Sequence, residues 1–327
     1  MSAAEPEEPP LQLGEDEVGA PPTGAAGALA GRLSRAVTEV EQSAVALAAL
    51  TALATVAATR PLPLGRRVTL GLAAAGAVGS HVRAAGRLAR EVRSATDAAS
   101  LTAVLGGAAP LFGRWAVEAD FAGIVAREVE QAPGLVVECG SGATTLIIAA
   151  MLRRSGRGRL VSIEHDEAYA ERTTRALEAA GLLDVVEVVV APLRDRQVAG
   201  RTVRWYDAER VTQAIDADID LLVVDGPPQR TRWSRWPALA VLHPRLAPHA
   251  TVLVDDGRTR AALATTRAWT DAFPDMERYW LDSVKGTWLL RRRPDDRSDG
   301  RSLGTLLKVA GALQPRPSGS GLWPVRR

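Results

Sequence analysis

Short apolar runs alternate with amphipathic stretches over the second half of the chain. Five runs have the length and β-branched content of buried strands: Leu135–Val137, Arg159–Ile163, Val185–Val190, Ile219–Val224 and Thr251–Val254. Between them, Ala168–Ala180 and Arg235–Leu246 carry apolar residues at helical spacing. Strands that alternate with helices in this way predict a parallel sheet with helices on both faces.

The first run leads into a glycine-rich turn. Gly134–Met151 reads GLVVECGSGATTLIIAAM, which predicts a strand, a tight turn and a helix. Gly140 and Gly142 allow positive φ angles and close approach of a ligand, and Thr144 or Thr145 can cap the helix. Unpaired amides at the start of that helix would face whatever lies beyond the strand.

Acidic residues stand at or directly after the ends of four predicted strands. They are Glu138, Glu164, Asp225 and Asp256. In an open parallel sheet, ligands bind beyond the carboxyl ends of the strands, so we expect these acids to converge on one crevice.

The glycine turn favours a cationic ligand over a dinucleotide. A dinucleotide site has a third glycine where this chain has Thr145. Glu138 matches a ligand that carries positive charge, such as S-adenosylmethionine with its ammonium and sulfonium groups. Here the chain resembles the class I S-adenosylmethionine-dependent methyltransferases, whose first motif is E-x-G-x-G. A simple structural turn is the alternative.

The resemblance covers about Leu111 to Arg293 and rests on six short motifs in a fixed order. They are Gly140–Thr145, Ser162–Asp166, Trp205–Asp207, Val224–Pro228, Arg235–Ala238 and Asp255–Arg258. The resemblance implies an α/β, Rossmann-like, doubly wound sheet of seven mostly parallel strands. Its closing antiparallel pair would be Met276–Leu281 and Thr287–Arg291, joined through Lys285-Gly286.

The resemblance also implies which residues bind the methyl donor. Glu164 would hold the ribose hydroxyls, and Ala191-Pro192-Leu193 would line the adenine. The full predicted set is Glu138, Gly140, Ser141, Gly142, Thr144, Thr145, Glu164, His165, Ala191, Pro192, Leu193 and Asp225. The acceptor is expected to be a small molecule methylated on a hydroxyl oxygen, and its identity is not carried by the motifs.

Asp225 and Asp256 are the candidate catalytic residues. Asp225 would act as a general base, or both would bind a divalent ion such as Mg2+, with Asp255 as an alternative ligand. Neighbouring parallel strands lie about 4.8 Å apart, so their terminal carboxylates can reach one ion. The structural alternative is that Asp225-Gly226 and Asp256-Gly257 are simple turn pairs.

The N-terminal third has a different composition. Residues 1–34 are acidic and rich in Pro, Gly and Ala, which predicts a disordered tail. Residues 35–100 form an Ala-rich helical extension with two uncharged runs, Gln42–Thr59 and Val68–Val82. Our hypothesis is a weakly membrane-associated hairpin through 42–82, with the methyltransferase domain (101–293) in the cytoplasm. The alternative is a helical pair that packs on itself or on a partner. Residues 294–327 read as an Arg/Pro/Gly-rich tail.

Charge and cysteine content narrow the function classes. The net charge is +2, and basic residues are not interleaved with aromatics, so nucleic-acid binding is not expected. The single cysteine, Cys139, rules out an internal disulfide and fits a reducing compartment. Two other functions compete with methyl transfer: an aminopropyltransferase, which shares the acidic crevice, and an inactive membrane or scaffold protein.

Overall fold

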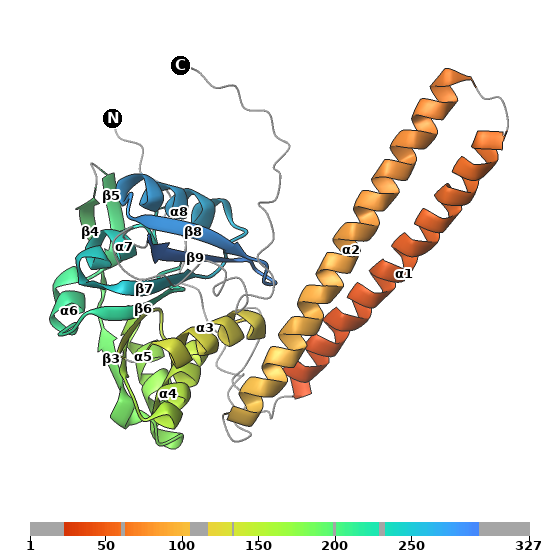
Figure 1. Ribbon diagram of the computed structural model, residues 1–327. Coiled ribbons are helices and arrows are strands. Elements are labelled where there is room, and N and C mark those ends of the chain that lie inside the picture. Colours follow the sequence, from red (N-terminus) through yellow and green to blue (C-terminus); the bar gives the residue numbers. More distant parts are fainter. Residues whose placement is uncertain are drawn as a thin grey trace, which may run out of the picture.

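A computed structural model describes residues 23–59, 63–104, 117–132, 134–198, 201–228 and 233–293. Figure 1 shows two parts, an α/β domain and a long antiparallel helical hairpin that projects from it. The hairpin consists of α1 (Thr23–Thr59) and α2 (Leu64–Val104). The α/β domain follows from α3 onward.

The domain is built on a seven-stranded sheet of order β3-β2-β1-β6-β7-β9-β8. The strands are β1 (Leu135–Cys139), β2 (Arg159–Glu164), β3 (Val186–Val190), β6 (Ile219–Val224), β7 (Leu246–Val254), β8 (Met276–Leu281) and β9 (Thr287–Arg292). The first five are parallel, and β9 runs antiparallel to both β7 and β8. This order and the closing antiparallel pair confirm the predicted fold class.

Helices cover both faces of the sheet, as the strand pattern predicted. On one face Val136 packs among residues of α3 (Ala119–Gln131) and α4 (Ala143–Ser155). On the other face Val137 packs with residues of α6 (Ala208–Gln213), α7 (Pro237–Leu242) and α8 (Arg260–Ala272). Successive side chains of β1 therefore enter different cores, because neighbouring residues on a strand point to opposite faces. α5 (Glu167–Ala179) packs beside α4 at the β3 edge.

The structure corrects several predicted elements. The run Val185–Val190 was expected to be buried, but β3 is the edge strand and its residues are half-buried or exposed. The helix expected over Arg235–Leu246 is shorter: α7 spans only Pro237–Leu242, and a 3-10 turn over His243–Arg245, which contains Pro244, follows it. β7 starts five residues before the predicted Thr251.

A second, two-stranded sheet was missed by the sequence analysis. It pairs β4 (Leu193–Val198) with β5 (Arg201–Tyr206) in antiparallel register. The segment around Trp205 was expected to be a loop or short strand. Instead, Trp205 and Tyr206 end β5 and are fully buried, while Asp207 caps α6.

The hairpin extends over more of the chain than the composition indicated. α1 begins at Thr23, inside the segment 1–34 that was predicted to be a disordered tail. Its alanines are strong helix formers, which accounts for the early start. α2 runs to Val104 and passes the expected boundary at residue 100. The expected tail 294–327 lies outside the described residues.

Candidate active site

The glycine turn after β1 packs against the turn after β6. Gly140 has a φ of 97°, and its N–H donates to the carbonyl of Ile163 at 2.8 Å. A Cβ on Gly140 would lie 3.0 Å from the backbone nitrogen of Gly226. The prediction of positive φ is confirmed, but the backbone that Gly140 approaches closely is the protein's own second turn.

Glu138 is completely buried at the end of β1. Its Oε2 accepts hydrogen bonds from the hydroxyls of Thr145 at 2.6 Å and Ser162 at 2.8 Å. Its Oε1 is buried and has no hydrogen-bond partner among the described residues. Burial raises the pKa of Glu138 to about 8, the two hydroxyls lower it, and the charges of Asp225 and Glu164 raise it.

Glu164 ends β2 and already accepts hydrogen bonds on both oxygens. Oε1 accepts from the backbone amides of His165 at 2.7 Å and Asp166 at 2.9 Å. Oε2 accepts from the amide of Ser141 at 3.1 Å and from its hydroxyl at 3.2 Å. Burial acts to raise the pKa of Glu164, but the hydrogen bonds from His165 and Asp166 bring it below its usual value. Glu164 therefore ties β2 to the glycine turn as an ionised carboxylate.

Three aspartates form a compact cluster beyond the ends of β6 and β7. Carboxylate oxygens of Asp225, Asp255 and Asp256 lie within 4.8 Å of one another. Asp255 is buried, and neither of its carboxylate oxygens has a hydrogen-bond partner among the described residues. Asp225 and Asp256 are partly exposed, with side-chain exposures of 34% and 30%. The cluster is thus exposed at Asp225 and Asp256 and buried at Asp255.

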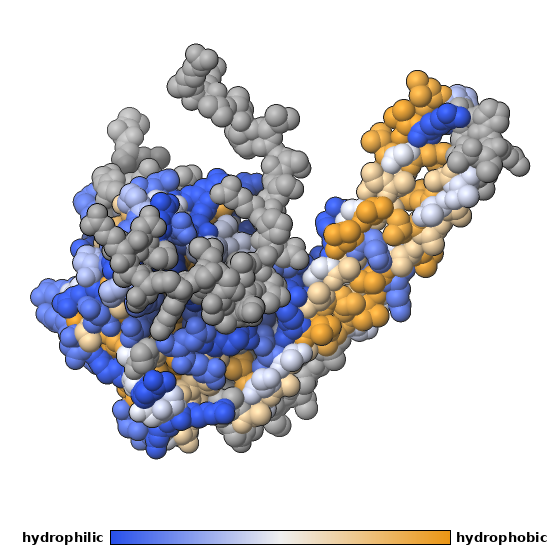
Figure 2. Space-filling model, viewed as in Figure 1, coloured by the Kyte–Doolittle hydropathy of each residue, from blue (hydrophilic) through white to orange (hydrophobic). Residues whose placement is uncertain are grey.

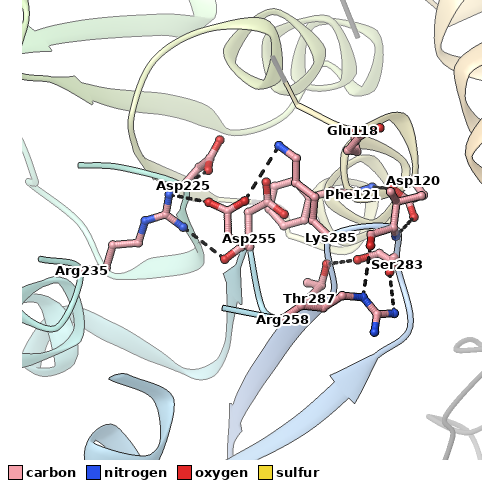
Figure 3. Close-up of polar contacts among 12 residues, drawn as sticks. Glu118, Asp120, Phe121, Asp225, Arg235, Asp255, Arg258, Ser283, Lys285 and Thr287 are labelled. Atoms are coloured by element: carbon pink, nitrogen blue, oxygen red, sulfur yellow. Dashed lines mark hydrogen bonds and ion pairs between the residues drawn. The ribbon is translucent and has the colours of Figure 1, made fainter. Parts of the chain in front are cut away.

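Arg235 is the cation that joins two of these acids (Figure 3). Its Nη2 donates to Oδ1 of Asp225 at 3.2 Å and to Oδ2 of Asp256 at 3.0 Å. Its Nη1 donates to the carbonyl of Asp255 at 3.2 Å, and its Nε to the carbonyl of Pro227 at 3.4 Å. The Arg235 side chain is only 5% exposed, so this guanidinium is a buried cation beside two partly exposed carboxylates.

The aspartate cluster combines raised pKa values with an uncommon backbone conformation. Burial raises the pKa of Asp225, and Arg235 opposes this. Burial, together with the charges of Asp225 and Asp256, raises the pKa of Asp255 well above its ordinary value. Asp256 has a φ of 56°, in the left-handed region that few residues other than glycine adopt. Such strain persists only where the surroundings enforce it, and it is common at functional sites.

A second cation reaches the cluster from the loop between β8 and β9. Nζ of Lys285 lies 3.9 Å from Oδ1 of Asp256. The buried Asp120 at the start of α3 accepts a hydrogen bond from the amide of Val284 at 2.6 Å, so α3 holds the same loop (Figure 3). Burial raises the pKa of Asp120 to about 6, although this amide and that of Phe121 lower it.

Comparison with known families identifies the domain. Residues 137–257 match the family described as a methyltransferase domain. The match begins inside β1 and ends just after the aspartate pair, so it contains the glycine turn and all four acidic strand ends. The chain carries a class I methyltransferase domain. It is an S-adenosylmethionine-dependent enzyme.

Solved structures with the same fold are distant in sequence, and no curated protein matches the chain. A methyltransferase from Geobacter sulfurreducens is 20% identical, over 53% of this chain and 78% of its own, with a TM-score of 0.40. The O-methyltransferase TomG from Streptomyces achromogenes, in complex with SAM, is 19% identical over 62% and 90%, with a TM-score of 0.41. An O-methyltransferase from Bacillus cereus, in complex with SAH, is 16% identical over 61% and 91%, with a TM-score of 0.41.

One carboxylate oxygen of the methyltransferase site fits the positive charge of the methyl donor. Oε1 of Glu138 is buried and unpartnered among the described residues. A buried acceptor without a donor costs about 1–3 kcal/mol, and a bound cationic group would remove that cost. The hydroxyl of Thr145 donates to Glu138 and accepts from the amide of Gly142, so its predicted role in donor binding stays a prediction. Glu138 is thus the predicted residue whose free atom best matches the donor.

The other predicted donor-binding residues lie around the same turn, and their roles remain predictions. Thr144 is buried in the first turn of α4, and Gly142 precedes that helix with a φ of 156°. Ala191 is buried, and its amide donates to the carbonyl of Glu164 at 2.7 Å. Pro192 and Leu193, both half-buried, connect it to β4. Nδ1 of the His165 ring also lies 2.7 Å from Oε1 of Glu164. For Glu164 to accept ribose hydroxyls, this ring or Ser141 would have to give up its contact.

Sequence reasoning missed four residues of this site: Ser162, Tyr206, Arg235 and Lys285. Arg235 and Ser162 stand inside recognised motifs, but nothing local shows that they contact acids 10 and 24 residues away. The hydroxyl of Tyr206 is buried beside Gly226 and unpartnered among the described residues. Only Lys285 could have been singled out from the sequence, because it is one of two lysines in a chain rich in arginine.

Proposed function

We propose that this methyltransferase transfers the methyl group of S-adenosylmethionine to a hydroxyl oxygen of a small molecule, and that Asp225 receives the hydroxyl proton. The bound donor supplies an electrophilic methyl group, whose bond to sulfur breaks while the electron pair stays on sulfur. The protein's work is to align the two reactants and to accept one proton.

The proposal rests on Asp225 because its side chain is accessible to an acceptor, one of its carboxylate oxygens has no hydrogen-bond partner among the described residues, and its pKa is raised. Its side chain is 34% exposed beside buried acids. Arg235 occupies Oδ1, and no hydrogen bond to Oδ2 is found among the described residues. A raised pKa brings a carboxylate closer to the basicity that general-base catalysis at neutral pH requires. Asp256 holds Arg235 from the other side and so fixes the guanidinium that orients Asp225.

A divalent ion is the second form of the same proposal. Mg2+ prefers oxygen ligands, and the two free oxygens of buried Asp255 adjoin those of Asp225 and Asp256. An ion there would acidify the acceptor hydroxyl directly. Arg235 already neutralises part of the cluster, so the ion would add to this cation or displace it. The two forms differ in whether a chelator stops the reaction.

The experiment that tests the proposal combines acceptor discovery with this distinction. The full-length protein is incubated with a methyl-deuterated donor and a fractionated small-molecule extract, and labelled products are sought by mass spectrometry. We expect a labelled methyl ether in wild type and none in Asp225→Asn. Turnover that persists in EDTA assigns the proton to Asp225 without help from a metal. Loss of turnover that Mg2+ restores shows that a bound ion acidifies the acceptor hydroxyl before Asp225 takes the proton. Labelling of nitrogen or carbon, or full activity of Asp225→Asn, would overturn the proposal.

A further inference from the structure

The outer half of the helical hairpin has no core of its own. Residues 44–55 of α1 and 64–82 of α2 contain no buried residue, although the two helices pack along each other (Figure 1). Val45 and Leu72 are each 70% exposed, and Leu53 is 53% exposed. Figure 2 shows this part of the hairpin as largely hydrophobic, in contrast to the hydrophilic surface of the domain. Something other than the partner helix must cover these side chains.

In the described part of the hairpin, the polar contacts between the two helices reach no further out than Ser43 and His81. Arg32 pairs with Glu91 at 3.2 Å, and Arg87 pairs with Glu39 at 2.9 Å. Further out, the hydroxyl of Ser43 hydrogen-bonds His81 at 2.9 Å. Beyond that point no charged residue occurs before Thr59 in α1, and none occurs between Arg67 and Arg83 in α2. A helix that is apolar on all faces is typical of a protein interior or a membrane, whereas a surface helix has one apolar stripe.

We propose that the hairpin enters a lipid bilayer, with the end where α1 meets α2 going in first. At 1.5 Å per residue the uncharged runs 42–59 and 68–82 rise about 27 Å and about 22 Å. The hydrocarbon core of a bilayer is about 30 Å thick, and local thinning accommodates a short segment. The exposed Arg66 and Arg67 in the first turn of α2 have side chains long enough to reach headgroups. By length and composition, Gly31–Thr55, with a mean hydropathy of 1.2, qualifies as a spanning segment.

The base of the hairpin complements an anionic membrane surface. A cavity of about 450 Å³ lies where α1, α2 and the domain meet, and its lining includes more cations than anions. The charged lining residues are Arg32, Arg35, Arg87, Arg90, Arg258, Glu39 and Glu91. When the apolar half is inserted, these arginines lie on the headgroup side of it, where Arg35 adds to cations that are already paired with Glu39, Glu91 and Asp282. Each arginine near an anionic surface contributes attraction that salt screens.

The same contacts place the methyltransferase site beside the bilayer. Arg90 of α2 donates to Asp282 at 3.2 Å, and Arg258 donates to the same carboxylate at 2.6 Å. Asp282 begins the β8–β9 loop, which also carries Lys285. The loop that reaches the aspartate cluster is therefore fastened to the base of the hairpin. This geometry points to an acceptor that partitions to the membrane surface, an inference that rests on the proposed function.

A second copy of the chain explains the surface less well. Two hairpins that pair in a four-helix bundle would each bury one stripe of their helices. The uncharged character of the outer half extends to every face, so a dimer would leave apolar side chains in water.

Vesicle flotation of the full-length protein tests the proposal. Vesicles of phosphatidylcholine alone and of phosphatidylcholine with phosphatidylglycerol are compared at low and high salt. We expect the protein to float with both, and more strongly with the anionic vesicles at low salt. The double variant Leu53→Glu, Leu72→Glu should lose roughly tenfold or more of the vesicle-bound fraction, because charge in the hydrocarbon region is costly.

The matched control places the same charges on exposed sites near the base. Val37 is 41% exposed and Val92 is 49% exposed, so Val37→Glu, Val92→Glu should float like wild type with vesicles of phosphatidylcholine alone, on which the two double variants are compared. Circular dichroism checks that both double variants keep their helices. Wild type that stays with the soluble fraction, or equal flotation of both double variants, would overturn the proposal. So would a dimer that Leu53→Glu disrupts in a protein that binds no vesicles. Methyl-donor binding measured on the same samples tests the site separately from the anchor.

Discussion

The hydroxyl of Thr145 donates to the buried carboxylate of Glu138 at 2.6 Å. Thr145 stands where a dinucleotide site has its third glycine. In this chain the residue at that position stabilises a buried acid instead. We expect Thr145→Val to leave Oε2 of Glu138 with one donor, Ser162. Thr145→Val should lower the free energy of unfolding by about 1–3 kcal/mol and weaken the binding of S-adenosylmethionine roughly tenfold. Thr145→Ser, which keeps the hydroxyl, is the control. Equal binding by the Val and Ser variants in calorimetry would show that the hydroxyl has no such role.

Ionisation of Glu138 gives the stability of the free enzyme a defined pH dependence. Its folded pKa is about 8, above the ordinary value of 4.5. The folded state then binds more protons than the unfolded state between these values, so this group's contribution to stability falls as pH rises from about 4.5 to about 8. Glu138→Gln should remove that decline, which urea titrations across the range would show. The same variant should bind the methyl donor more weakly. A decline of the same slope in Glu138→Gln would assign it to other groups.

The close contact between the two turns makes Gly140 a structural residue as well as a site residue. A Cβ there would lie 3.0 Å from the nitrogen and 3.1 Å from the Cα of Gly226, and φ is 97°. Gly140→Ala should therefore destabilise by about 1–3 kcal/mol more than Gly156→Ala. Gly156 also has a positive φ, 65°, but a Cβ at that position meets nothing within 4 Å. Equal melting temperatures of the two variants would show that the turns can separate without cost.

Arg235 neutralises a cluster that would otherwise hold three carboxylates in a small volume. Arg235→Ala leaves Asp225, Asp255 and Asp256 without their shared buried cation, and a loss of about 3–5 kcal/mol is expected. Mild acid should restore part of the stability, since protonation removes the same repulsion. Arg267→Ala on the exposed face of α8 is the control. Thermal melts of Arg235→Ala with and without Mg2+ also report on the cluster: a rise with Mg2+ supports an ion site. A variant as stable as wild type would contradict the role given to Arg235.

The sequence predicted the parts of this enzyme that depend on local pattern. Ile219–Val224 matches β6 residue for residue, because an apolar β-branched run bounded by turn residues is a local signal. Met276–Leu281, which the family resemblance implied, matches β8 in the same way. Asp225 and Asp256, two of the four acids predicted at the strand ends, lie close together as expected, since parallel strands end at one edge. The edge position of β3 was not predictable, because burial depends on which strand lies next to it.

The contacts that organise the crevice were beyond local reasoning. Arg235 is 21 residues away from Asp256 in the chain, and Lys285 contacts the same acid from the loop between β8 and β9. One of the two hydroxyls that hold Oε2 of Glu138 belongs to Ser162 on the neighbouring strand. These facts follow from strand order and register, which spacing along the chain does not encode.

The most direct test of the account is calorimetric titration of the full-length protein with S-adenosylmethionine, its demethylated product and NADH, repeated on Glu138→Gln. The account predicts micromolar binding of the methyl donor and its product, on the order of 8 kcal/mol, and no binding of NADH. Because S-adenosylmethionine carries a sulfonium charge that its product lacks, Glu138→Gln should weaken its binding more than that of the product. Binding of NADH with none of the methyl donor would contradict the account, and donor affinity unchanged in Glu138→Gln would contradict the role given to the buried carboxylate.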